Sequence, residues 1–264
     1  MQAPRSKGST STAVDRRDAL RGIAALAVGA AGCGSSSPPR ADLSAPDTVV
    51  AQTRWLELVS HLCLLYLPPL AIALRPEPRP LLIALHDHDE TPPSSLDRWR
   101  AAADASGFVV LCPNWTAEPS DRQEALLDHL MLIVEELDAK TQPVDLAHTC
   151  LATRGTATPY GYRGAFERFS GRWAAATFLG GVPGGDWAGA PAAAMANLTE
   201  APPAVHYTIG DKDPALDAAR SCAIALAGRG VATEQVVVPG TLATLAFDAT
   251  RVWAWLSQHQ AKHP

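Results

Sequence analysis

The 264-residue sequence lacks two features that would indicate common functions: a basic cluster in its main part, and cysteines at metal-site spacing. The formal net charge of the whole chain is −5. The first 32 residues contain five basic and two acidic residues, a balance of +3, so the remaining residues carry −8. An acidic body without a basic patch argues against binding to nucleic acid. The five cysteines form no CxxC pair and no Cys/His zinc spacing.

The beginning of the chain also lacks a membrane-spanning segment. The apolar run Gly22–Gly32 is too short, because a bilayer span needs about 20 residues. The run follows Asp15–Arg21, which resembles a twin-arginine motif. Residues 1–33 are therefore predicted to be a twin-arginine-type export signal with a lipobox-like end.

Cys33 is the predicted site of lipid attachment. It follows Ala30, Ala31 and Gly32, which together resemble a lipobox without its usual leucine. The alternative is ordinary cleavage after Ala30 and Ala31, with Cys33 incidental. Residues 34–46 are rich in Ser and Pro and are predicted to be a flexible tether. These features predict a cell-envelope lipoprotein, or otherwise a periplasmic protein, that contacts the membrane only through a lipid anchor.

From residue 47 onward, short apolar runs alternate with segments of helical periodicity. Strands are expected at Thr48–Arg54, Leu56–Leu67, Leu81–Leu85, Phe108–Leu111, Thr149–Ala152, Ala174–Leu179, Ala204–Ile209 and Gln235–Val238. Helices are expected at Leu96–Ser106, Asp121–Lys140, Ala215–Gly228 and Phe247–Gln260. This alternation predicts a single α/β domain, residues 47–264, with a mostly parallel central sheet and helices on both faces. Ligands of such sheets bind at the carboxyl ends of the strands.

Several blocks, in order along the chain, resemble α/β-hydrolase esterases of the polyhydroxyalkanoate depolymerase and feruloyl esterase kind. The blocks are Leu65–Pro69, Pro80–His86, Arg98–Ala103, Gly107–Pro113, Val144–Ala152, Arg172–Ala176 and Gly210–Pro214. The resemblance covers roughly Leu64 to the C-terminus and implies an α/β-hydrolase fold with esterase-like ancestry.

The catalytic positions depart from that family. Its G-x-S-x-G elbow corresponds to Thr153–Ala157, so Gly155 stands where the nucleophilic serine would be. The base histidine would fall in Pro239–Thr244, where Ala243 takes its place. The acid position is retained as Asp213, although an aspartate before Pro214 also suits a helix N-cap. The resemblance therefore implies a degenerate triad.

The positions that would hold an oxyanion are also altered. His86–Thr91 replaces the glycine-rich HGxGGT pattern, and His88 and Thr156 are the residues equivalent to the oxyanion donors. Three acidic residues in this loop place negative charge where an oxyanion should be stabilised. This charge opposes ester hydrolysis.

The preferred hypothesis is a non-catalytic protein that binds a small ligand or an envelope partner. One alternative is a diverged hydrolase that uses Thr156 and Asp213, although a threonine nucleophile still needs a base. A further alternative is a metal-dependent function, with His86, His88 and Asp89 as candidate ligands. No cofactor is expected.

Other reactive or aromatic side chains have simpler interpretations. Cys150 and His206 lie within predicted strands and are expected to be core residues. His259, near the C-terminus, is expected to be solvated. Three tryptophans are candidates to line a pocket at the carboxyl ends of the strands, with ordinary packing as the alternative: Trp115, Trp173 and Trp187.

Overall fold

A computed structural model describes residues 49–73, 77–117, 120–181, 183–184, 190–196, 198, 200 and 202–264. The chain divides into two compact units, Met1–Pro46 and Asp47–Pro264. The predicted export signal, the lipid attachment site Cys33 and the tether at 34–46 lie outside the described residues. None of the described helices combines the length and the apolar character needed to cross a membrane.

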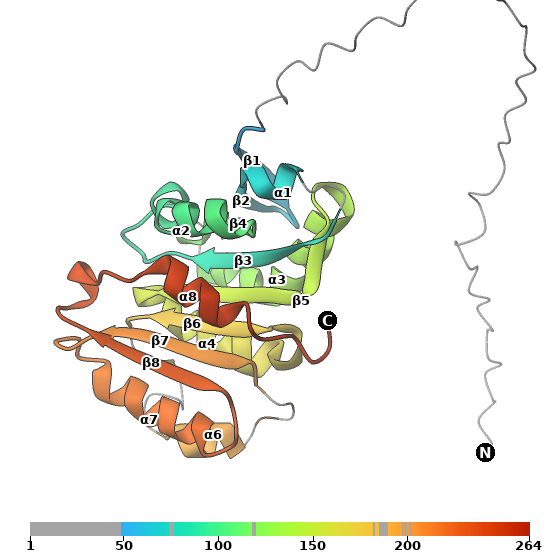
Figure 1. Cartoon of the computed structure of the whole chain (residues 1–264). Helices are drawn as coiled ribbons and strands as arrows, with labels where there is room; N and C mark the ends of the chain where they lie inside the picture. The colour runs from blue at the N-terminus through green and yellow to red at the C-terminus, as the bar shows by residue number, and fades with distance from the viewer. Residues whose placement is uncertain are drawn as a thin grey trace, which may run out of the picture. The chain divides into compact units, whose positions relative to one another are not determined.

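The second unit is built on one eight-stranded sheet in the order β1-β2-β4-β3-β5-β6-β7-β8 (Figure 1). Strands β1 and β2, and β2 and β4, pair antiparallel, whereas the pairs from β4 through β3 to β8 are parallel. The strands are β1 (Gln52–Leu58), β2 (His61–Leu67), β3 (Arg79–Leu85), β4 (Val109–Pro113), β5 (Val144–Arg154), β6 (Ala175–Leu179), β7 (Ala204–Gly210) and β8 (Thr233–Val238). The predicted α/β fold with a mostly parallel sheet is confirmed.

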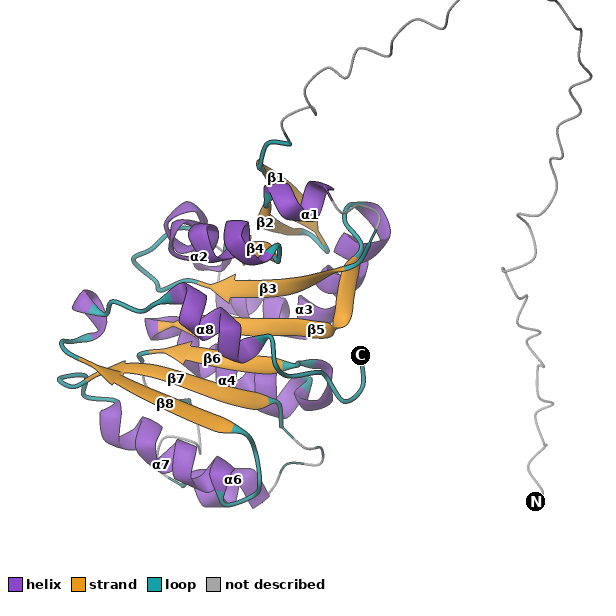
Figure 2. Cartoon of the chain, in the orientation of Figure 1, coloured by secondary structure: helices purple, strands orange, loops and turns teal. Residues whose placement is uncertain are grey.

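Helices cover both faces of the sheet (Figure 2). They are α1 (Pro69–Ala73), α2 (Pro92–Ser106), α3 (Ser120–Lys140), α4 (Thr158–Tyr162), α6 (Pro191–Ala196), α7 (Leu216–Ala227) and α8 (Ala249–Leu256). Short helical turns are η1 (Trp115–Ala117), η2 (Gly155–Ala157), η3 (Arg163–Arg168), η4 (Ser170–Arg172) and η5 (Leu242–Thr244).

Strand β3 shows why the central strands are apolar without interruption. Leu81, Ile83 and Leu85 point into a core that includes residues of α3 and α7. Leu82 and Ala84 point into a second core, on the other face, that includes residues of α2 and α8. Because both faces are covered, most residues of such a strand are apolar, and the alternation that marks a half-exposed strand is lost.

The first hairpin and several element ends differ from the prediction. The expected strands Thr48–Arg54 and Leu56–Leu67 become β1 and β2, which are joined by a turn at Val59 and Ser60 with φ of 50° and 65°. The apolar run therefore bends within what the sequence presented as one strand. Helix α8 is shorter than predicted because Asp248 caps its start, accepting hydrogen bonds from the backbone of Thr250 and Arg251.

The parallel strands direct one set of loops to one edge of the sheet. In Figure 1 the arrowheads of β3, β6, β7 and β8 point to the same edge, and the C-terminus lies at the opposite one. The loops after β3, β5, β7 and β8 contain the residues that the resemblance assigns to an active site. This carboxyl edge is therefore the place to look for a catalytic arrangement.

Candidate functional site

The elbow turn after β5 is present, but it carries no side chain. Gly155 has φ of 56°, a left-handed conformation that glycine adopts without steric cost. A Cβ placed on Gly155 would lie 2.0 Å from Oδ2 of Asp87, so no larger residue fits while Asp87 holds its position. The bulk of Thr153, which replaces the first elbow glycine, is accommodated because Gly161 faces it: a Cβ there would lie 2.4 Å from Thr153 Cγ2.

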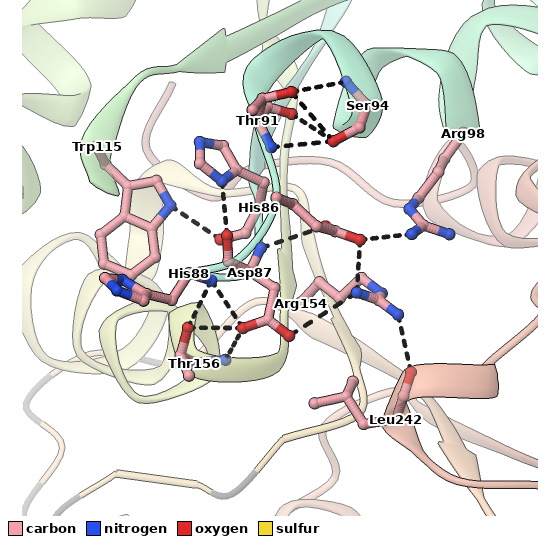
Figure 3. Close-up of polar contacts among 11 residues, drawn as sticks. His86, Asp87, His88, Thr91, Ser94, Arg98, Trp115, Arg154, Thr156 and Leu242 are labelled. Carbon is pink, nitrogen blue, oxygen red and sulfur yellow. Dashed lines mark hydrogen bonds and ion pairs between the residues drawn. The ribbon is translucent and has the colours of Figure 1, made fainter. Parts of the chain in front are cut away.

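The carboxylate of Asp87 lies between the two residues that the resemblance assigns to oxyanion binding, His88 and Thr156 (Figure 3). Its Oδ1 accepts hydrogen bonds from the backbone N–H of His88 at 2.8 Å and of Thr156 at 2.9 Å. It also accepts one from the Thr156 hydroxyl at 2.7 Å. The structure thus brings together the two residues assigned to the oxyanion position, and the chain's own carboxylate lies between their N–H groups.

Asp87 is 7% exposed, and it is nevertheless held as a carboxylate. Burial raises its pKa, but the hydrogen bonds from Thr156 and His88 and the charge of Arg154 outweigh burial, and the net pKa lies below the usual value. A negative charge therefore lies beside the backbone N–H groups of His88 and Thr156.

Arg154 fills the space beside Asp87 (Figure 3). Its guanidinium lies 2.6 Å from Oε1 of Glu90 and 3.8 Å from Oδ2 of Asp87. It also donates to the carbonyl oxygen of Leu242, in the loop after β8, at 2.8 Å. Glu90 in turn pairs with Arg98 of α2. The cavity next to Arg154 has a volume of only about 10 Å³, roughly the minimum for a single water.

Asp213 lies at the acid position but faces an apolar partner. Its Oδ1 accepts a hydrogen bond from the backbone N–H of Ala215 at 2.9 Å, which is the helix-start role that the sequence offered as the alternative. Its Oδ2 is buried and has no hydrogen-bond partner among the described residues. A Cβ on Gly180 would lie 3.2 Å from this oxygen and 2.6 Å from Leu242 Cδ1, so the side chain near the acid is leucine. Ala243, the predicted base position, is the next residue and is exposed.

The candidate metal ligands do not converge. His86 is buried and its Nδ1 lies 2.8 Å from the carbonyl oxygen of Asp87, whereas His88 and Asp89 are exposed. Burial lowers the pKa of His86; the backbone hydrogen bond with Asp87 and the charges of Glu90 and Asp87 oppose this effect only in part. Across the described ranges, no three His, Cys, Asp or Glu side chains are grouped closely enough to hold a metal ion.

The remaining reactive candidates are core residues. Burial raises the pKa of the Cys150 thiol to about 12, which leaves it unreactive at neutral pH. Burial lowers the pKa of His206 to about 4, and its Nδ1 lies 3.1 Å from the hydroxyl oxygen of Thr177. Neither side chain is therefore available for nucleophilic or base chemistry.

Two of the predicted pocket tryptophans lie at opposite edges of the sheet. Trp115 donates its indole N–H to the carbonyl oxygen of His86 at 2.9 Å, at the carboxyl edge. Trp173 precedes β6 and lines a cavity at the amino edge, so its predicted location was wrong. Trp187 lies outside the described residues.

No family model matches this chain, and no curated protein sequence does. Solved structures do match. An S-formylglutathione hydrolase (FrmB) from Staphylococcus aureus superposes with a TM-score of 0.61 at 14% identity, over 80% of this chain and 98% of that one. The feruloyl esterase module from Clostridium thermocellum, complexed with sinapinate, gives 0.60 at 12% identity, over 81% and 92%. An esterase from Thermogutta terrifontis, Est2, gives 0.54 at 12% identity, over 81% and 91%.

The protein therefore has an α/β-hydrolase fold, as its sequence blocks predicted. At these identities the likeness concerns the fold alone. The chemistry of the carboxyl edge has to be argued from this chain's own residues.

The sequence did not reveal that Asp87 and Arg154 fill the site. The available signals were the absence of a side chain at Gly155, an acid-rich loop where glycines were expected, and an arginine inside the elbow. Each of these was visible singly. Their meeting at one point depends on the pairing of β3 with β5.

Proposed function

We propose that this protein is a non-catalytic member of the esterase-like α/β-hydrolase fold, exported and anchored in the cell envelope by a lipid on Cys33. The observation that supports the loss of catalysis is the position of Asp87. Its carboxylate accepts the N–H groups of His88 and Thr156, at 2.8 and 2.9 Å, that would otherwise stabilise an oxyanion. The elbow residue below it, Gly155, has no nucleophilic atom.

The other groups of the carboxyl edge fit this proposal. The Thr156 hydroxyl is engaged by Asp87, so it is not directed at a base. The loop after β8 presents Leu242 to the retained acid, and a leucine cannot accept a proton. Losing the nucleophile or the base costs on the order of 10⁶ in rate in a well-studied serine hydrolase, and this chain has neither at the expected positions.

The catalytic part of the proposal is tested with short acyl p-nitrophenyl esters. We expect the purified protein to hydrolyse p-nitrophenyl acetate and butyrate at the buffer rate and to remain unlabelled by a serine-directed phosphonate. Turnover that the phosphonate abolishes would overturn the proposal. Turnover that Thr156→Val or Asp213→Asn removes would instead favour a diverged hydrolase that uses those residues.

The export part of the proposal rests on the sequence of residues 1–46. A paired arginine, a short apolar run and a cysteine after small residues are together typical of a lipoprotein signal. Replacing Arg16 and Arg17 by lysine is expected to block export. Cys33→Ser is expected to abolish incorporation of labelled palmitate and to release the protein from the membrane fraction. Membrane retention of the serine variant would contradict lipid anchoring.

A binding role would then have to use a surface other than the ancestral site. Arg154, Glu90 and Asp87 fill that site, with side chains only 8 to 11% exposed. A ligand of ordinary size cannot enter without displacing this ion-pair network. A ligand would therefore bind in a cavity elsewhere on the protein, such as the one at the amino edge of the sheet.

A further inference from the structure

A cavity lies at the amino edge of β6, β7 and β8, opposite the ancestral site. Its volume is about 470 Å³, within the range of about 300–1,000 Å³ typical of small-molecule sites. The starts of these strands form its inner wall, together with the turn between α7 and β8 at 229–232. The C-terminal segment at 259–262 forms another part of the wall.

Hydrogen bonds hold the walls of this amino-edge cavity in place. In the C-terminal segment, the backbone N–H of Ala261 donates to the carbonyl oxygen of Ala147 at 2.8 Å. The N–H of His263 donates to the carbonyl oxygen of Gly171 at 2.9 Å. On the floor, Trp173 is 1% exposed, and its indole N–H donates to the Gly164 carbonyl oxygen at 3.1 Å. The cavity is therefore a preformed feature of the fold.

The polar groups of the cavity favour an anion. Arg229 and Lys262 line it, and neither forms an ion pair with any residue that the structure describes. Glu200, the carboxylate of the lining, already accepts hydrogen bonds from the Ser170 hydroxyl at 3.3 Å and the Gly171 N–H at 3.2 Å. The described lining thus has an excess of one positive charge, on a chain whose formal net charge is −5.

His259 adds a hydrogen-bonding group to this cavity. Contrary to the expectation of a solvated residue, its Nε2 is buried and has no hydrogen-bond partner in the described parts of the chain. Burial lowers the pKa of His259, so the ring is neutral at pH 7 and can donate or accept one hydrogen bond. Leu198 and Val231, both partly exposed, provide an apolar wall.

We propose that the amino-edge cavity binds a small monocarboxylate with an apolar body. The carboxylate lies at the rim with Arg229 and Lys262, and the apolar body packs against Leu198 and Val231. An arginine and a lysine at an exposed rim suit a carboxylate, and the apolar wall suits an aryl or alkyl group. This inference does not depend on whether the carboxyl edge is catalytically inactive.

The test uses 3-phenylpropionate as the probe and 3-phenylpropanamide as its neutral match. We expect saturable binding of the carboxylate to the purified protein by calorimetry, and markedly weaker binding of the amide. Arg229→Gln and Lys262→Gln are each expected to weaken carboxylate binding about 2- to 5-fold, because each removes one exposed charge contact. Arg220→Gln is the matched control on α7, since Arg220 pairs with Asp217 and does not line the cavity.

A second variant tests the location independently of charge. Val231→Trp fills the cavity from the turn before β8 and is expected to abolish binding while the circular dichroism spectrum is retained. The proposal is wrong if no saturable binding of 3-phenylpropionate occurs up to about 10 mM, a range that still detects sites of a few kcal/mol. It is equally wrong if the amide binds as well as the carboxylate, or if Arg229→Gln binds like the Arg220→Gln control.

Discussion

Replacing Asp87 by alanine should destabilise the protein by about 1–3 kcal/mol, because the backbone N–H of Thr156 loses its acceptor at the elbow. Asp87 Oδ1 accepts from the backbone N–H groups of His88 and Thr156 and from the Thr156 hydroxyl. The His88 N–H also donates to the Thr156 hydroxyl oxygen at 2.9 Å and keeps that acceptor, and a water entering above Gly155 would recover part of the cost at Thr156. Asp87→Asn keeps an acceptor oxygen and loses only the charge, so we expect about 1–2 kcal/mol for that variant.

The pH dependence of this difference has a definite sign. The pKa of Asp87 is lowered in the folded protein, so its charge stabilises the fold fully above the unfolded-state pKa of about 3.9. This contribution is lost as the pH falls through the lower, folded-state pKa. The gap in unfolding free energy between the wild type and Asp87→Asn should therefore be constant from about pH 5 to 8 and shrink below about pH 4.

Urea unfolding, followed by tryptophan fluorescence between pH 3 and 8, measures both effects. Asp97→Asn, at an exposed position of α2 where Asp97 pairs with Arg100, is the control and should change stability by less than about 0.5 kcal/mol. If Asp87→Ala unfolds at pH 7 with the same free energy as the wild type, Asp87 is not the acceptor that stabilises the N–H groups at the elbow. A gap that widens below pH 4 would refute the lowered pKa.

Three further predictions follow from the same region and from the core. Gly155→Ala should lower the free energy of unfolding by at least about 2 kcal/mol, because its Cβ would lie 2.0 Å from Asp87 Oδ2 at a left-handed φ. The same substitution should cost less in the Asp87→Ala variant, and a double-mutant cycle measures the difference. Arg154→Met should lower the unfolding free energy by about 2–4 kcal/mol, because Glu90 and the Leu242 carbonyl lose a buried partner, whereas Arg172→Met at an exposed ion pair should cost under about 1 kcal/mol. His206, with a pKa of about 4, should titrate below pH 5 when followed by NMR. Because this pKa is lowered in the folded protein, the free energy of unfolding should fall by about 3 kcal/mol between about pH 6.5 and 4. A measured pKa near 6.5 in the folded protein would contradict the burial of His206.

Local patterns in the sequence were sufficient for most of the fold. The continuous apolar run at 81–85 correctly indicated a strand buried on both faces, since such strands lose the polar alternation. Gly107 after a helical segment correctly indicated a helix end, and its φ is 73°. The hairpin turn at Val59 and Ser60 was missed because neither residue is a usual turn former and their left-handed conformation is imposed by strand pairing.

The sequence by itself determined what the carboxyl edge lacks: a side chain at Gly155, and a histidine after β8. Only the tertiary structure decided what takes their place, because the decisive contacts join residues far apart in the chain. Asp87 meets Thr156 across 69 positions, and Arg154 meets Leu242 across 88. At the opposite edge, the C-terminal segment places His259 and Lys262 beside Arg229, which lies in the turn before β8.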